Sequence, residues 1–272
     1  MKKTVLITGA SSGLGNAAAG FFAANGWNVI ATMRSPEKET ILTQMKNVLV
    51  TRLDVQSPDT ITDAVAAGIA KFGKIDVLVN NAGYALLGIF EAAGREQIRR
   101  QFDVNVFGLM EVTQAILPHF RQQQSGVIIN ISSFGGQVAL PIGSLYNATK
   151  FAVEGFSESL AYELSAIGVA VKIVEPGSIN TNFRTSVDLI ANPHTEYNAV
   201  SKRFMERYPA TTGHLPRATA EEVAATIYEA ATDGTTRLRY VAGADAQFYI
   251  DMKTKNSDTA FTGLMRDYFI HE

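Results

Sequence analysis

Residues 5–15 read VLITGASSGLG, an apolar run followed by a turn rich in glycine and serine. The run is β-branched and apolar, as is typical of a buried strand. After the turn, a helical pattern continues to Asn25 and stops before Gly26. This order places the turn at the carboxyl end of a strand, which is where open α/β sheets bind ligands.

The glycines of this turn have separate expected roles. Gly9 permits a tight turn, Gly13 lets a pyrophosphate approach backbone N–H groups, and Gly15 lets the helix pack closely on the strand. The spacing differs from the GxGxxG fingerprint, and a purely structural turn is the alternative. In an alternating α/β chain the turn favours a dinucleotide, with expected contacts at Gly9, Ser11, Ser12, Gly13, Leu14 and Gly15.

The same alternation of apolar runs and helix-length amphipathic segments continues along the chain. Several runs are apolar throughout, as in strands covered on both faces. The pattern predicts an α/β fold with a doubly wound parallel sheet and helices on both faces. No linker or repeat divides the chain, so residues 1–272 are expected to form a single domain. Expected strands are residues 5–8, 29–32, 48–53, 77–80, 127–132, 169–175 and a short one around 240–241.

SFGGQVALPIGSLYNATK, residues 133–150, carries the candidate chemistry. If its end is helical, Tyr146 and Lys150 project from one face, one turn apart. A phenol with a pKa of ~10 transfers protons poorly at neutral pH, and a drop of roughly 3 units, about 4 kcal/mol, is needed. An ammonium at ~4 Å in a partly buried site supplies energy of that order. Ser133 ends an apolar run and could join them; a chance, solvated Tyr–Lys pair is the alternative.

The helix that begins near Tyr146 is expected to be amphipathic. Its apolar stripe is formed by Phe156, Leu160 and Leu164. Glu154 and Glu158 are expected together on its solvated side.

The second expected strand ends in ATMRS, residues 31–35. Met33 stands where an acidic residue would accept a hydrogen bond from the ribose 2′-OH of NAD. Arg34 and Ser35 instead offer a guanidinium and a hydroxyl, which suit a 2′-phosphate. The sequence therefore predicts that NADP(H) is preferred and NAD(H) possible, the alternative being an arginine that is merely exposed.

Two further strand ends carry polar residues. In LDV, residues 53–55, the Asp54 carboxylate is expected to accept from the adenine amino group. In NNAG, residues 80–83, the backbone is expected to face the ribose. Either segment could instead be an Asx turn without a ligand. The cofactor contacts expected here are Asp54, Val55, Asn81, Ala82 and Gly83.

Asn105 lies inside an amphipathic segment, QFDVNVFGLM. Asparagine is unfavourable within a helix, and a polar side chain there needs a partner. A structural amide bonded to the backbone is the simplest explanation.

Composition excludes several other classes of site and partner. The chain has no cysteine, and its four histidines stand apart without metal-binding spacing, so no metal is expected. A net charge of −2 gives no reason to expect nucleic acid or an anionic membrane. The uncharged segment 122–149 is too polar for a membrane span, so a cytoplasmic protein is expected.

TGASSGLG, NNAG, Asn105, Ser133, Tyr146-NAT-Lys150 and PGSINT (residues 176–181) occur in this order between residues 8 and 181. Together they resemble the short-chain dehydrogenase/reductase family. The resemblance implies a single Rossmann-type domain of about seven strands and a homodimer or homotetramer. Beyond about residue 182 the chain is similar only in length and in a helix-then-strand rhythm.

The resemblance also implies an oxidoreductase that interconverts a carbonyl (ketone or aldehyde) and an alcohol by hydride transfer. Tyr146 would be the general acid/base, and Lys150 would lower the pKa of the phenol and bind the nicotinamide ribose. Ser133 would hold the substrate oxygen, and Asn105 would anchor a water relay to Lys150. The nicotinamide would be lined by Pro176, Gly177, Ile179 and Thr181.

Substrate identity is expected to reside in a variable lid at about 182–216. Its aromatic residues favour an apolar small-molecule carbonyl or alcohol substrate, with ordinary packing as the alternative. The tail after 244 would pack on a partner subunit or cover the pocket. Candidate pocket residues are Phe183, Tyr197, Phe204, Met205 and Tyr208, together with Phe134, Leu140 and Ile142.

Two other functions compete with this hypothesis. A non-catalytic NADP-binding redox sensor would be expected to lose the tyrosine or the lysine, whereas here all four catalytic positions are filled. A sugar-nucleotide epimerase or dehydratase of the extended branch would have GxxGxxG spacing in its glycine turn, which this chain lacks.

Arg34→Asp is predicted to abolish the preference for NADPH over NADH. The new carboxylate would repel a 2′-phosphate and accept from a ribose 2′-OH. The ratio of kcat/KM for the two cofactors measures the effect, and an unchanged NADPH preference would refute the assignment.

Overall fold

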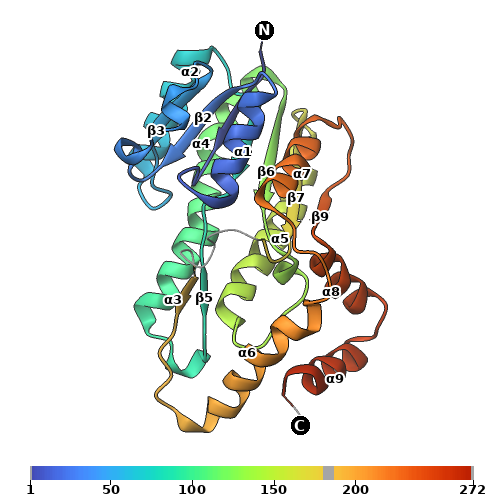
Figure 1. Ribbon diagram of the computed structural model, residues 1–272. Helices are drawn as coiled ribbons and strands as arrows, with labels where there is room; N and C mark the ends of the chain where they lie inside the picture. The colour runs from blue at the N-terminus through green and yellow to red at the C-terminus, as the bar shows by residue number, and fades with distance from the viewer. Residues whose placement is uncertain (1, 180–186, 271–272) are drawn as a thin grey trace.

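The computed structural model describes residues 2–179 and 187–270. Its centre is a seven-stranded parallel sheet in the order β3-β2-β1-β4-β6-β7-β9 (Figure 1). All the expected strands are confirmed, each to within one residue at either end. They are β1 (Thr4–Ile7), β2 (Asn28–Met33), β3 (Val48–Arg52), β4 (Val77–Asn80), β6 (Gly126–Ile131), β7 (Val169–Pro176) and β9 (Arg239–Ala242).

Helices cover both faces of the sheet, as expected (Figure 1). Val5 and Ile7 of β1 pack with one helical layer, whereas Leu6 between them packs with the opposite layer. This double burial explains why β1 is apolar throughout. The first layer contains α1 (Gly13–Ala24) and α7 (Ala220–Thr232), and the second contains α2 (Pro58–Phe72), α4 (Gly108–Gln123) and α5 (Ser144–Ser165).

A smaller parallel sheet of β5 (Ala85–Leu87) and β8 (Val187–Leu189) was not expected. Each strand has three residues, too few for a periodic pattern. Next to β5, α3 (Arg95–Phe102) continues into a π-helical turn at Asp103–Phe107 and then into α4. Short 3-10 helices occupy Pro36–Lys38, Leu42–Gln44, Phe90–Ala92, Phe134–Gly136 and Thr195–Tyr197.

The last helices lie together at the end of the molecule beyond β9 (Figure 1). Phe204 of α6 (Asn198–Thr212) contacts Phe269 of α9 (Asp258–Phe269), with ring centroids 5.3 Å apart. Tyr249 of α8 (Ala244–Thr254) stacks on Phe134, with centroids 5.2 Å apart. The tail therefore packs on its own chain.

The aromatic residues expected in a pocket are mostly packed instead. Phe134 and Phe204 belong to a buried cluster, so ordinary packing accounts for them. Met205 is 63% exposed, so packing does not account for it, and its place in a pocket stays a prediction. The Tyr208 hydroxyl lies 3.0 Å from the Ser178 hydroxyl and remains a candidate. Phe183 lies outside the described residues.

Helix α5 departs from its expected pattern at Glu154. Leu160 and Leu164 pack in the core, and the Glu158 side chain is 44% exposed, but Glu154 is only 6% exposed. Arg239 of β9 explains the difference, because its Nε donates to Glu154 Oε2 (2.9 Å) and its Nη2 to Glu158 Oε2 (2.6 Å). The pairing of β9 with β7 brings this arginine to α5, and no local pattern in the helix shows it.

No helix in the described part of the chain combines the length and the apolar character needed to cross a bilayer.

Candidate active site

The candidate residues form a row along one edge of the sheet. Because neighbouring strands are parallel, their carboxyl ends meet at the same edge. The order of strands along the chain reverses between β1 and β4, which is the position where doubly wound sheets bind ligands. In sheet order, the row contains Asp54, Arg34, Gly9, Asn81, Ser133 and Pro176.

The glycine turn requires glycine at more than one position. Gly9 has a φ of +69° and Gly13 a φ of +54°, a region that other residues rarely adopt. A Cβ added to Gly9 would lie 2.9 Å from Ala82 Cα, and one added to Gly15 would lie 2.3 Å from the Gly9 carbonyl oxygen. Gly15 thus allows the helix to pack on the turn itself.

Thr8 fastens the glycine turn to the NNAG loop. Its hydroxyl accepts hydrogen bonds from the backbone N–H groups of Asn81 and Ala82, each at 3.0 Å. In return, Asn81 Nδ2 donates to the carbonyl groups of Thr8 (2.8 Å) and Gly9 (3.1 Å). The N–H groups of Asn81 and Ala82 are therefore used within the protein, which leaves their carbonyl groups for a ligand. The sequence reasoning missed this role of Thr8.

The amino end of α1 is open to an anion. Ser12 occupies the N-cap position without a side-chain cap, and the first turn has no acidic residue. Among the described residues, no acceptor bonds the N–H groups of Gly13 and Leu14. Ser11, Ser12 and Gly13 are exposed. Free N–H groups at a helix amino end suit a phosphate.

The side chains at the neighbouring strand ends differ in whether they already have partners within the protein. Arg34 is exposed, and the described part of the chain provides no ion-pair partner for it; Ser35 beside it is half-buried. Asp54 forms an Asx turn, since its Oδ1 accepts from the Gln56 N–H at 3.1 Å. Val55 is buried against Gly108, where an added Cβ would lie 2.7 Å from the Val55 Cβ.

Tyr146 and Lys150 lie near the start of α5, facing the end of β6. Lys150 Nζ donates to the Ile131 carbonyl at 2.8 Å and lies 5.8 Å from the centre of the Tyr146 ring. The Ser133 hydroxyl lies near the Tyr146 phenol, donates to the Pro176 carbonyl at 3.5 Å and accepts from the Gly135 N–H at 3.1 Å. The structure therefore brings these three side chains together, and it places Ser133, rather than Ser132, beside the phenol.

Burial dominates the proton affinities here. It raises the pKa of Tyr146 to about 12, although the hydrogen bond from Ser133 lowers it. Burial also lowers the pKa of Lys150 to about 8, and the Glu154 carboxylate opposes that change. The prediction of a lowered Tyr146 pKa was wrong for this structure, because loss of hydration outweighs the other influences. At pH 7 the phenol keeps its proton and the lysine its charge.

The π-helical turn places the Asn105 side chain beneath the NNAG loop. Its Nδ2 donates to the Tyr84 carbonyl (2.8 Å) and to the Thr149 hydroxyl (3.1 Å), and its Oδ1 accepts from the Tyr84 N–H (3.0 Å). The amide is thus bonded to the backbone, as the structural explanation proposed. It also links the loop to the residue before Lys150. Its role in a water relay stays a prediction.

The segment after β7 is held by Asp245 of α8. Asp245 Oδ2 accepts from the Ser178 N–H at 2.7 Å, and a Cβ added to Gly177 would lie 1.9 Å from Asp245 Oδ1. Pro176 ends β7, and Ile179 packs against the core. Thr181 lies outside the described residues.

Two further buried groups shape the site and were missed from the sequence. Asp245 stands far along the chain in a segment without a recognisable motif. Asn147 lies between Tyr146 and Lys150, and its Nδ2 donates to the Gly135 carbonyl at 2.7 Å. It holds the loop that carries Ser133 against α5. An asparagine near the start of a helix was the available signal.

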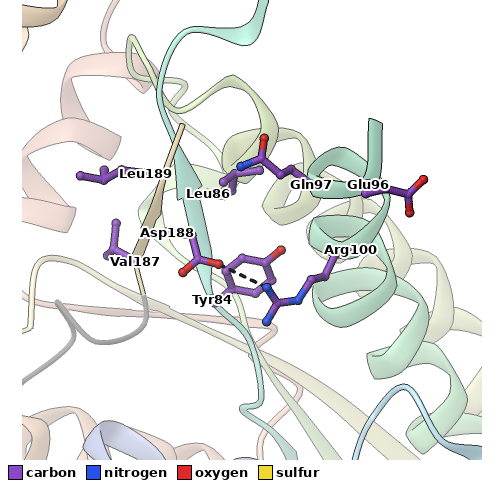
Figure 2. A pocket seen from close by; sticks show the side chains of 8 residues that line it. All are labelled: Tyr84, Leu86, Glu96, Gln97, Arg100, Val187, Asp188 and Leu189. Atoms are coloured by element: carbon purple, nitrogen blue, oxygen red, sulfur yellow. Dashed lines mark ion pairs between the residues drawn. The ribbon is translucent and has the colours of Figure 1, made fainter. Parts of the chain in front are cut away.

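A hollow beside this site lies between β5, β8 and α3 (Figure 2). Arg100 spans it, 3.5 Å from Asp188 Oδ2 and 5.2 Å from the centre of the Tyr84 ring. None of the candidate catalytic side chains lines it. Its lining residues are Tyr84, Leu86, Glu96, Gln97, Arg100, Val187, Asp188 and Leu189.

Comparison with known proteins defines the class. The family model described as short chain dehydrogenase matches residues 3–189. An uncharacterized oxidoreductase of Schizosaccharomyces pombe is 42% identical over 236 residues, 86% of this chain and 98% of that protein. A 3-ketodihydrosphingosine reductase of Bacteroides thetaiotaomicron is 40% identical over 179 residues, 66% of this chain and 65% of that protein. The chain belongs to the short-chain dehydrogenase family of oxidoreductases.

Solved structures agree with this family. A short-chain dehydrogenase from Streptomyces avermitilis has a TM-score of 0.85 at 33% identity, covering 98% of this chain and 97% of that one. ElxO with NADP bound has a TM-score of 0.74 at 29% identity, covering 89% and 98%. A 3-ketoacyl-(acyl-carrier-protein) reductase from Brucella melitensis, complexed with NADH, has a TM-score of 0.77 at 26% identity, covering 90% and 98%.

Thr8→Val is predicted to lower the free energy of unfolding by about 2–6 kcal/mol, because two backbone N–H groups lose their acceptor at about 1–3 kcal/mol each. Urea unfolding measures the loss. Thr8→Ser keeps the hydroxyl and serves as the matched control. Equal stability of the valine and serine variants would show that the hydrogen bonds to the Thr8 hydroxyl do not stabilise the protein.

Proposed function

We propose that this oxidoreductase is an NADP(H)-dependent reductase that converts a ketone or aldehyde into an alcohol, with Tyr146 as the general acid. The observation that carries the proposal is the meeting of Ser133, Tyr146 and Lys150 at the end of β6. A protonated phenol can donate to a carbonyl oxygen, as reduction requires.

The cofactor assignment rests on two features of this chain. The uncapped amino end of α1 suits a diphosphate, and the exposed Arg34 guanidinium suits a 2′-phosphate. The bound NADP in ElxO and NADH in the Brucella reductase support a nicotinamide cofactor, with NADP(H) preferred and NAD(H) possible. When bound, NADPH would supply the hydride.

The side chains divide the remaining chemistry. The Ser133 hydroxyl holds the substrate oxygen within reach of the Tyr146 phenol. Tyr146 transfers its proton to that oxygen as negative charge develops on it. Lys150 remains positive at pH 7, since its pKa is about 8, and its charge stabilises the phenolate that forms. Asn105 holds the neighbouring loop against α5.

The proposed substrate is an apolar carbonyl compound. The aromatic residue Tyr208 lies close to the candidate site, where it hydrogen-bonds Ser178 just after Gly177. The relative that is a 3-ketodihydrosphingosine reductase is consistent with a ketone on an apolar chain. We propose that α6 forms part of a lid over the site within one domain.

Tyr146→Phe is predicted to reduce kcat by roughly 10²–10⁴-fold, because it removes the general acid. NADPH absorbance at pH 7 with a panel of ketones measures turnover, and the affinity for NADPH should not change. Tyr162→Phe is the matched control, since Tyr162 lies on the same helix and is 72% exposed.

Two outcomes would contradict the proposal. Equal turnover by wild type and Tyr146→Phe would remove Tyr146 from the mechanism. Tight NADPH binding without turnover of any carbonyl would favour the non-catalytic redox sensor.

A further inference from the structure

Two buried carboxyl groups meet behind the candidate catalytic residues. Glu175 is fully buried on β7, immediately before Pro176, and Glu154 is 6% exposed on α5, one turn after Lys150. The two side chains lie within hydrogen-bonding reach of each other. Each has one buried oxygen, Glu154 Oε1 and Glu175 Oε2, for which the described part of the chain offers no donor.

The charges around this pair do not balance if both groups ionise. Arg239 is the cation in direct contact, with its Nε 2.9 Å from Glu154 Oε2 and 3.9 Å from Glu175 Oε1. The same guanidinium also binds Glu158 through Nη2 at 2.6 Å. Three carboxyl groups therefore share one guanidinium. Two adjacent buried carboxylates cannot both carry a charge at low cost.

The remaining neighbours connect the pair to the active site. Gln137 Nε2 donates to Glu175 Oε1, and Gln137 ends the loop that carries Ser133. On α5, Lys150 is the cation that faces Glu154. The packing leaves no slack, because a Cβ added to Gly136 would lie 2.9 Å from Glu154 Cγ and 3.0 Å from the Lys150 carbonyl oxygen.

We propose that Glu154 and Glu175 share one proton, held by Glu175, and that the ionised Glu154 is a positioning residue that keeps Lys150 charged. A proton between the two carboxyl groups gives each orphaned oxygen a partner, and it leaves one negative charge between Arg239 and Lys150. The assignment of Lys150 as the beneficiary rests on the proposed function; the shared proton does not.

The proton affinities agree with this arrangement. Burial and the neighbouring Glu154 together raise the pKa of Glu175 to about 7, against the opposing effects of Gln137 and Arg239. The Glu154 carboxylate raises the pKa of Lys150 against the effect of burial. Without it, Lys150 would lose its charge at a lower pH.

The shared proton is tested by stability as a function of pH. Below about 4.5, its ordinary value, Glu175 is protonated in both states; between there and about 7 only the folded protein keeps the proton. Stability should therefore fall as pH rises through this window.

Glu175→Gln binds no proton, so its melting temperature should vary less with pH across the window. Glu154→Gln should flatten the curve as well, and it provides the test if Glu175→Gln does not fold.

Glu158→Gln is the matched control. It removes a carboxyl group bound to the same arginine on the same helix, but this group is half exposed and its pKa is lowered by Arg239. Its contribution to stability is lost as pH falls below its ordinary value of 4.5, outside the window. An unchanged slope in both Glu175→Gln and Glu154→Gln would overturn the shared proton.

The effect on Lys150 is tested by the pH profile of carbonyl reduction. In Glu154→Gln the alkaline fall of kcat/KM should move to lower pH, with a several-fold loss at pH 8 and little loss at pH 6, whereas Glu158→Gln should match wild type. If Glu154→Gln flattens the dependence of stability on pH but leaves the alkaline fall of kcat/KM at the same pH as in wild type, only the positioning role is overturned. Absence of turnover with every carbonyl would defeat the proposed function, while the stability curves would still decide the shared proton.

Discussion

The candidate active site depends on the burial of two ionisable groups together at the end of β6, the Tyr146 phenol and the Lys150 ammonium. Lys150 exchanges its hydration for a hydrogen bond to the Ile131 carbonyl, and the Tyr146 phenol is buried near the Ser133 hydroxyl. Loss of hydration disfavours both ionised forms, so the phenol holds its proton more tightly and the lysine less tightly. The phenol is consequently protonated at neutral pH, which is the state that the proposed reduction requires of its general acid.

The sheet makes this arrangement possible. Seven parallel strands bring residues from distant parts of the chain to one edge. Small buried contacts then fix the loops: Thr8 joins the first and fourth strand ends, Asn105 joins the next loop to α5, and Asn147 holds the loop that carries Ser133. These hydroxyl and amide groups bond mainly to backbone groups. They hold the loops that carry the candidate catalytic side chains in position.

The sequence predicted the sheet because its strands are buried on both faces and are therefore apolar throughout, which is visible in the sequence alone. It also predicted which side chains would meet, because the ends of parallel strands share an edge. It did not predict the burial of Glu154, which depends on Arg239, 85 residues later in the chain. Nor did it predict the direction of the Tyr146 pKa, since spacing shows a nearby charge but not the loss of water that opposes it. The three-residue strands β5 and β8 are too short for any periodic pattern.

The direct measurement is the ionisation of Tyr146 itself, followed as the ultraviolet tyrosinate signal of wild type minus that of Tyr146→Phe during a pH titration. Burial predicts that this difference stays flat through the ordinary tyrosine range near ~10 and rises only toward a pKa of about 12. A tyrosinate that forms near neutral pH would contradict it, and would show that the charge of Lys150, not the loss of hydration, controls the phenol.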